Sequence, residues 1–118
     1  VRIIPDQPLL LRALAHVQIE LNDPAYLDQA ILNLRAALHR EPRSPSSWRD
    51  LAIAQGRLGR MGQSSLALAE EALLMHDLGA ASFHASRAEK LFGEGSPGWI
   101  QAQDILNAAK KAKKKKEE

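Results

Sequence analysis

Histidine is the residue type in this chain best suited to metal binding or acid–base chemistry. The four histidines are His16, His39, His76 and His84, and cysteine is absent. A zinc-peptidase motif, H-E-x-x-H, needs two histidines one helical turn apart and a glutamate beside the first, so that both rings bind one ion and the carboxylate activates its water. No two histidines here have that spacing. We therefore expect no catalytic, cofactor-binding or metal-binding residues, which predicts that this chain is not itself an enzyme.

A lysine-rich tail, residues 110–118, is the second chemically distinctive segment. Its six lysines and two glutamates carry a charge of +4, so residues 1–109, with 10 basic and 12 acidic side chains, carry −2. A mildly acidic body predicts no nucleic-acid partner. A lysine run of this kind is more often a solvated helix end, where cations are favoured by the negative C-terminal pole. The alternative is that the tail binds phosphates or anionic lipid.

The hydropathy of the chain and its first residues bear on membrane insertion and on whether the sequence is a segment of a longer protein. No apolar run approaches the roughly 20 residues of a membrane-spanning helix, so we expect no membrane span. The first residues, Val1-Arg2-Ile3-Ile4-Pro5, have neither a methionine nor the layout of a signal peptide. We interpret the sequence as a segment of a longer protein.

The elements that would position any functional residue are helices. Alanine and leucine dominate, aromatic residues make up 4%, and threonine is absent, which predicts an all-α class. Apolar residues at Leu10, Leu14, Val17 and Leu21 form a helical stripe within residues 6–21. Further helices are predicted at about 24–39, 45–59, 63–76 and 80–92, and from 99 into the tail. Tight turns between six short helices predict an antiparallel array.

A recurring junction organises these helices. Ser44-Pro45 precedes Trp48, and Ser96-Pro97-Gly98-Trp99 repeats the pattern. Serine can cap a helix whose first turn holds proline, so each junction ends one helix and begins another. Such recurrence predicts an internal repeat.

Counting back from Trp48, the second helix of a 34-residue unit reads Ala30-x3-Leu34-x2-Ala37-x4-Pro42. This pattern resembles the tetratricopeptide repeat (TPR). The resemblance implies a TPR-like superhelix, or solenoid, in a single domain over 1–109, with a plain six-helix bundle as the alternative. The domain divides into a unit (11–44), an odd helix (45–61), a unit (62–95) and a closing helix (96–109). The residues expected to pack the helices together are Ala30, Leu34, Ala37, Pro42, Trp48, Leu51, Ala52, Leu68, Ala69, Ala81, Ala85, Ala88 and Trp99.

Longer stretches over about 23–107, such as 23–31, 47–54 and 95–106, resemble the C-terminal TPR region of bacterial periplasmic zinc metalloproteases of the β-barrel assembly-enhancing type. The resemblance implies a non-catalytic protein-interaction segment of a larger metalloprotease in envelope protein quality control. Zinc would then belong to the parent protein, and the location would be the periplasm. The alternative is a free-standing cytosolic TPR adaptor.

Recognition is the function left for such a segment. The helix faces not committed to packing are expected to line a concave groove for a protein or peptide, with the catalytic domain of the same chain as another candidate partner. The predicted groove residues are Arg12, Ile19, Asn22, Arg49, Ile53, Arg57, Gln63, Glu70 and Leu73. The apolar closing helix also offers a surface for self-association.

Overall fold

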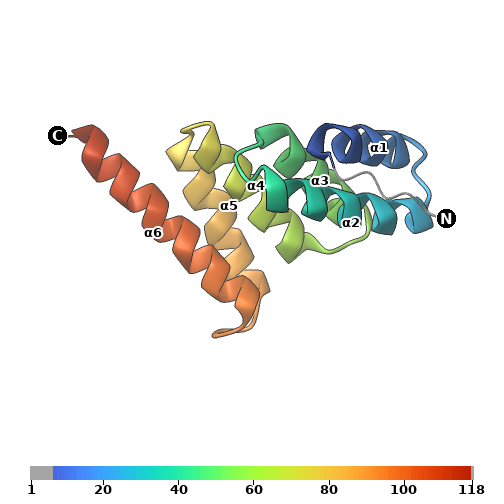
Figure 1. Cartoon of the computed structure of the whole chain (residues 1–118). Helices are drawn as coiled ribbons and strands as arrows, with labels where there is room; N and C mark the ends of the chain where they lie inside the picture. The colour runs from blue at the N-terminus through green and yellow to red at the C-terminus, as the bar shows by residue number, and fades with distance from the viewer. Residues whose placement is uncertain (1–6, 118) are drawn as a thin grey trace.

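The computed structural model describes residues 7–117 and contains six α-helices (Figure 1). They are α1 (Pro8–Glu20), α2 (Pro24–Arg40), α3 (Pro45–Arg57), α4 (Met61–Leu74), α5 (Leu78–Leu91) and α6 (Pro97–Glu117). No strand occurs within residues 7–117. The predicted all-α class is therefore confirmed.

Side-chain caps explain where several helices begin. Asp23 accepts a hydrogen bond from the Ala25 amide at 2.9 Å just before α2, and Asp77 accepts one from the Ala80 amide at 3.1 Å before α5. The serines of both recurring junctions accept amide hydrogen bonds at 3.4 Å, Ser44 from Ser47 and Ser96 from Trp99. These caps satisfy amides that have no partner inside the helix.

Backbone conformation explains where other helices end. Asn22, Gly59 and His76 follow the last residues of α1, α3 and α4, and their φ angles are 51°, 77° and 60°. A left-handed residue just after a helix turns the chain away from the helical path. The short turns that follow allow consecutive helices to pack side by side.

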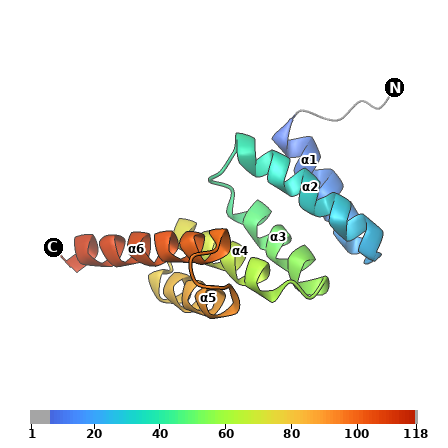
Figure 2. The same ribbon diagram turned by 90° about the horizontal axis from the view of Figure 1, so that it is seen from below.

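The helices form an elongated array of 53 × 29 × 22 Å. Each helix packs against the next in the chain, α1 also approaches α3, and α4 also approaches α6. Within residues 7–117, α3 with α4 is the sole close pair that joins the group α1–α3 to the group α4–α6. Figures 1 and 2 show these two groups, and both show α6 projecting beyond α4 and α5.

Alanine dominates the contacts within each group. Ala15, Ala30 and Ala54 are fully buried in the core of α1–α3, and Ala69, Ala85, Ala88 and Ala102 in the core of α4–α6. A methyl group at a crossing lets two backbones approach and admits a larger side chain from the neighbour. Leu34 is the largest side chain that the array buries completely.

The predicted packing residues differ in how far they are buried. Buried are Ala30, Leu34, Ala37, Leu51, Ala52, Ala69, Ala81, Ala85 and Ala88. Trp48, Leu68 and Trp99 are half-buried, and Pro42 is exposed. The buried face of α2 consists of the six apolar residues that helical periodicity predicts for it: Leu27, Ala30, Ile31, Leu34, Ala37 and Leu38.

Helix α1 buries a different face from the one its apolar stripe suggests. Leu10, Leu14, Val17 and Leu21 are 40–57% exposed, whereas Leu11, Ala15, Gln18 and Ile19 are buried. Gln18 is fixed by donating to the Gln29 side chain at 3.1 Å and accepting from that of Asn33 at 2.9 Å. Because α1 ends the array and contacts only α2 and α3, one apolar face has no neighbour within residues 7–117.

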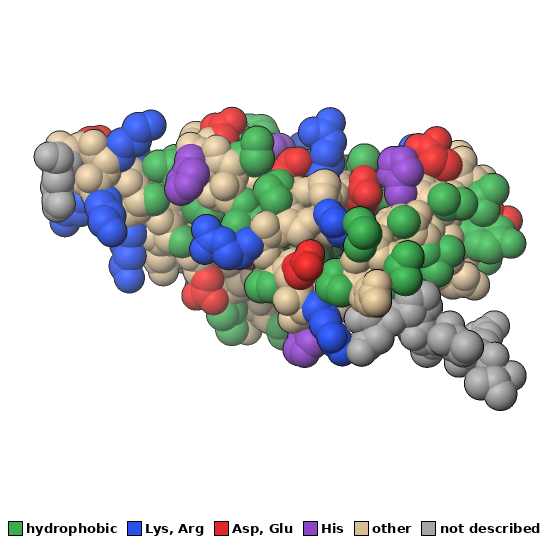
Figure 3. Space-filling view, turned by 45° about the horizontal axis from the view of Figure 1, so that its top comes forward, with side chains coloured by type: hydrophobic (Ala, Val, Ile, Leu, Met, Phe, Trp, Pro, Cys, Tyr) green, Lys and Arg blue, Asp and Glu red, His purple; other side chains and the backbone are tan. Residues whose placement is uncertain are grey.

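The lysine-rich segment is part of a helix. α6 runs without a break from Pro97 to Glu117, so the boundary expected at residue 110 is not a boundary of secondary structure. Figure 3 shows basic side chains gathered on the projecting end of α6, and hydrophobic side chains at the opposite end of the array, over α1.

The seam between α3 and α4 is polar. Ser64 Oγ donates to the Ala52 carbonyl oxygen at 2.8 Å, and Gln55, Ser64 and Ser65 are buried. A β-carbon added at Gly56 would lie 3.3 Å from Ser64 Oγ, so the two helices approach closely at this point. Hydrogen bonds as well as apolar contacts therefore hold the two groups together.

The ring of Phe92 joins the beginnings of α4 and α6. β-Carbons added at Gly62 and Gly98 would lie 2.9 Å and 2.5 Å from opposite edges of this ring. The ring cannot move away from one glycine without approaching the other. Glycine at both positions is thus a steric requirement.

Replacement of Gly98 tests this packing. Gly98→Ala should lower the free energy of unfolding by about 1–3 kcal/mol, because the new methyl group overlaps a ring that has no room to move. Gly93→Ala is the matched control, since a β-carbon there meets nothing within 4 Å. Urea unfolding followed by circular dichroism measures both. Equal stability of the two variants would show that the Phe92 contact is not tight.

Candidate functional site

A groove crosses the seam between the two groups of helices. It has a volume of about 450 Å³ and is lined by α2, α3, α4 and α6. The lining residues are Arg35, Leu38, His39, Trp48, Leu51, Gln55, Gln63, Leu66, Ala67, Pro97, Gly98 and Gln101. Leucines supply apolar contact, glutamines supply amides, and the rim on α2 carries Arg35 and His39, which are exposed.

Trp48 is fixed by the first recurring junction. Its indole Nε1–H donates to the Pro42 carbonyl oxygen at 3.0 Å, and its ring packs partly against the core of α1–α3. Ser44 caps the same helix and also lies 2.9 Å from the Ser47 hydroxyl. The indole therefore presents a rigid apolar surface to the groove, and it loses little conformational entropy on binding a ligand.

The second recurring junction contributes another part of the lining. Pro97 and Gly98 begin α6 and share the groove with Trp48, although about 50 residues of chain separate them. The repeated sequence thus marks two segments that meet at one site.

The deepest polar group of the groove is the Gln55 amide. Gln55 is 2% exposed, and its Oε1 accepts from Arg60 Nη1 at 3.5 Å. The Arg60 amide donates to the Gln55 carbonyl oxygen at 3.0 Å, and Arg60 Nη2 lies 3.1 Å from Asp28 Oδ1. Arg60 therefore holds both the backbone and the side chain of Gln55 in place.

Glu70 lies beside the groove on α4 and is half-buried. Burial raises the pKa of its carboxyl above the ordinary value of 4.5, while a hydrogen bond with the Gln101 side chain acts in the opposite direction. Removal from water disfavours the charged form, and this effect is the larger one. Because Gln101 lines the groove, the protonation of Glu70 is coupled to the orientation of a lining amide.

The nine predicted groove residues do not come together in one place. Gln63 lines the groove and Glu70 neighbours it. Three arginines contact other helices instead. Arg12 Nη1 donates to the Ser44 and Ser46 hydroxyls at 3.3 and 3.2 Å, and Arg57 Nη1 donates to the Ile19 carbonyl oxygen at 2.7 Å. Arg49 lies 3.7 Å from Glu71.

The remaining predicted groove residues lie in several environments. Ile19 is 3% exposed within the core of α1–α3, so its side chain is not available to a ligand, contrary to the prediction. Leu73 packs against the core of α4–α6. Ile53 is 37% exposed on α3, and Asn22 occupies the turn after α1.

Sequence reasoning missed most of the actual lining, including Arg35, Gln55 and Gln101. Its useful signals were the outward face of the fourth helix, which gave Gln63, and the recurring junction, which names Trp48, Pro97 and Gly98. Helical periodicity identifies the outward face of one helix, but it does not say which outward faces meet.

Histidine, aspartate and glutamate are the metal-ligating residue types found within residues 7–117. No group of three or more His, Asp or Glu side chains there is arranged to hold a metal ion. His16 lies 3.8 Å from Glu20 and 3.7 Å from Asp50, and His84 makes an edge-to-face contact with Phe83. None of the helices described is both long enough and apolar enough to cross a bilayer.

Comparison with protein-family models, curated proteins and solved structures finds no match to this chain.

The pKa of Glu70 leads to a test of the site. Because the pKa is raised in the folded state, that state binds the proton more tightly than the unfolded state does, and stability is lost as pH rises through the folded pKa. Glu70→Gln removes the buried charge and should raise the melting temperature at pH 7. The gain over wild type should shrink as pH falls and vanish below 4.5, the ordinary carboxyl value.

Thermal unfolding between pH 4 and 8 measures this difference. Glu94→Gln, in the exposed α5–α6 loop, is the matched control because it removes the same charge without altering a buried group. If the melting temperatures of Glu70→Gln and wild type differed by the same amount at every pH, the raised pKa of Glu70 would be contradicted.

Proposed function

We propose that this chain is a non-catalytic protein-interaction module that binds a polypeptide segment in the groove of α2, α3, α4 and α6. The observation that carries this proposal is the convergence of a fixed, half-buried indole and the half-buried amides of Gln63 and Gln101 on one open groove between four helices. Rigid aromatic and aliphatic surface with a few polar groups is typical of binding sites.

The chemistry of the groove restricts the ligand. The half-buried ring of Trp48, which lies over the buried Leu51 and Leu66, favours an apolar anchor side chain. The amides of Gln63 and Gln101 can both donate and accept, so they suit the backbone of an extended or helical segment. Arg35 and His39 on the rim favour a carboxylate next to the anchor. The expected ligand is thus a short segment with a large apolar residue and a nearby acidic residue.

Charge reversal on the rim tests the groove. Peptides selected from a displayed library on the wild-type chain should contain this pairing, and Arg35→Glu should weaken their binding roughly tenfold through loss of a charge-assisted contact. Arg87→Glu, an exposed reversal on α5 outside the groove, should leave affinity unchanged. Fluorescence anisotropy measures the affinities.

The two tryptophan side chains report independently whether a peptide binds in the groove. Trp48 lines the groove and Trp99 does not, so a bound peptide should shift the indole N–H resonance of Trp48 and leave that of Trp99 in place. Peptides that shift neither resonance, or that bind Arg35→Glu as tightly as wild type, would sink the proposal. Trp48→Ala is unsuitable here because the ring also supports the core, and its loss costs about 3–5 kcal/mol.

The proposed setting of this module follows from the sequence resemblance alone. In that setting the chain is the C-terminal TPR segment of a bacterial zinc metalloprotease of the cell envelope, and its groove binds substrate, assembly machinery or the catalytic domain. A cytosolic TPR adaptor would use the same groove. Reading the gene upstream of Val1 separates the two: an H-E-x-x-H helix and a signal peptide are expected for the first, and a short gene without a catalytic domain for the second.

A further inference from the structure

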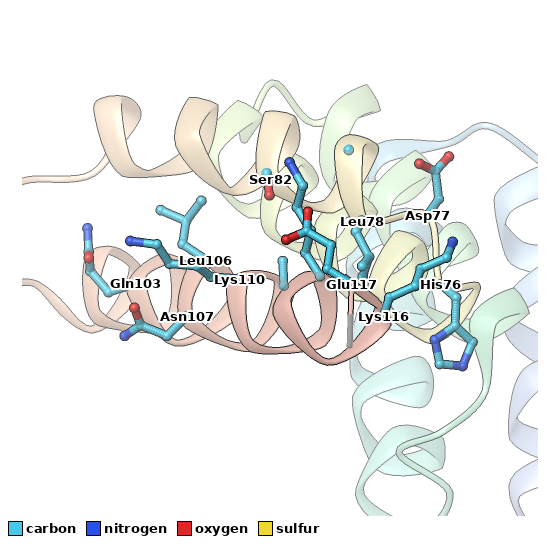
Figure 4. A pocket seen from close by; sticks show the side chains of 13 residues that line it. His76, Asp77, Leu78, Ser82, Gln103, Leu106, Asn107, Lys110, Lys116 and Glu117 are labelled. Atoms are coloured by element: carbon cyan, nitrogen blue, oxygen red, sulfur yellow. The ribbon is translucent and has the colours of Figure 1, made fainter.

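A second hollow lies between the C-terminal half of α6 and the turn from α4 to α5. Its volume is about 1030 Å³, and it shares no lining residue with the groove of α2, α3, α4 and α6. His76 and Leu78 line it from the turn, and Leu106, Lys110, Lys113 and Lys116 line it from α6 (Figure 4). We call this second hollow the lysine groove.

The lysines of α6 project in several directions. Lys110, Lys113 and Lys116 are spaced three residues apart and line the lysine groove. At 100° per residue, Lys111 and Lys115 project from nearly the opposite side of α6, whereas Lys114 lies only about 40° from Lys110. All of these lysines are exposed, so Lys111 and Lys115 differ from Lys113 and Lys116 in direction and not in charge or accessibility.

The floor of the lysine groove is apolar. Leu78, Leu106 and Ala109 line it beneath the lysines. Two carboxylates also line it. Asp77 Oδ1 accepts from the Ala80 amide at 3.1 Å, so one of them is engaged in capping α5, and the other belongs to Glu117. The three lysines outnumber the two carboxylates, and the lysine groove combines positive charge with buried apolar surface.

We propose that the lysine groove binds an acidic amphipathic α-helix of a partner protein. The lining of α6 from Gln103 to Lys116 is about 20 Å long, the length of a helix of roughly 14 residues. Such a helix would place leucine-like side chains on Leu78 and Leu106 and glutamates opposite the three lysines, as in other helix-in-groove complexes. A phosphate backbone or a lipid surface would gain nothing from the apolar floor and would use the lysines on both sides of α6 alike.

Repulsion between the lysines makes binding of the partner helix sensitive to salt and detectable by hydrogen exchange. Lysines three and four residues apart on a helix repel one another, and Lys110, Lys113 and Lys116 form such a series. Carboxylates of a bound helix offset this repulsion. Binding therefore increases the protection of amides 110–117 against hydrogen exchange, and high salt weakens binding.

Two double charge reversals test the proposal on the whole chain. The probe is a labelled synthetic helix of about 14 residues with leucine at every third or fourth position and glutamate at the flanking positions. Lys113→Glu/Lys116→Glu should weaken its binding by about tenfold or more, whereas Lys111→Glu/Lys115→Glu should stay within about threefold of wild type. The two variants have equal net charge, so only the direction of the side chains differs.

Additional probes separate the contributions of charge and apolar surface. Replacing the probe's leucines by serine should abolish binding, and replacing its glutamates by glutamine should weaken it. If a double variant fails to fold by circular dichroism, Lys113→Glu and Lys115→Glu make the same comparison singly. The proposal is overturned if the matched variants lose affinity for the probe equally, or if the serine probe binds with full affinity. It is also overturned if a single-stranded oligonucleotide or an anionic lipid vesicle binds the chain more tightly than the probe does.

Discussion

Close approach of helices at alanine is the constraint on which this structure depends. Ala30, Ala54, Ala69, Ala85 and Ala102 are completely buried at helix crossings, and each would need the backbone to shift if it were larger. A core built from methyl groups is thin, so each helix is stabilised mainly by its neighbours along the chain. This arrangement leaves open surfaces along the array, and both grooves lie on such surfaces.

Interior elements could be predicted from sequence far better than terminal ones. The buried face of α2 follows from helical period because α2 lies between two neighbours. For α1 the same reasoning finds an amphipathic helix but selects Leu10, Leu14, Val17 and Leu21, since periodicity records which residues are apolar and not which side has a neighbour. The most apolar stripe of an end helix can remain uncovered while alanine and glutamine face the core.

The grooves could not be derived from spacing within one helix. The groove of α2, α3, α4 and α6, for example, is lined by residues far apart in sequence, such as Arg35 and Gln101, and it exists only once four helices are in place. Arg12 and Arg57 show the converse problem. Both have the charge and reach of ligand-binding residues, yet each donates to an acceptor of its own chain. The recurring junction did point to residues of the groove, because a capping serine and a proline are local sequence signals. The two copies of the junction begin helices that share one groove.

The polar seam between α3 and α4 has a mechanical consequence. Trp48 and Arg35 belong to one group of helices, Gln63 and Gly98 belong to the other, and the α3–α4 crossing is their close connection within residues 7–117. The aperture between these walls is therefore governed by a single interhelical angle. α6, about 30 Å long, acts as a lever arm on that angle, so a force applied to its projecting end is transmitted to the groove at its base.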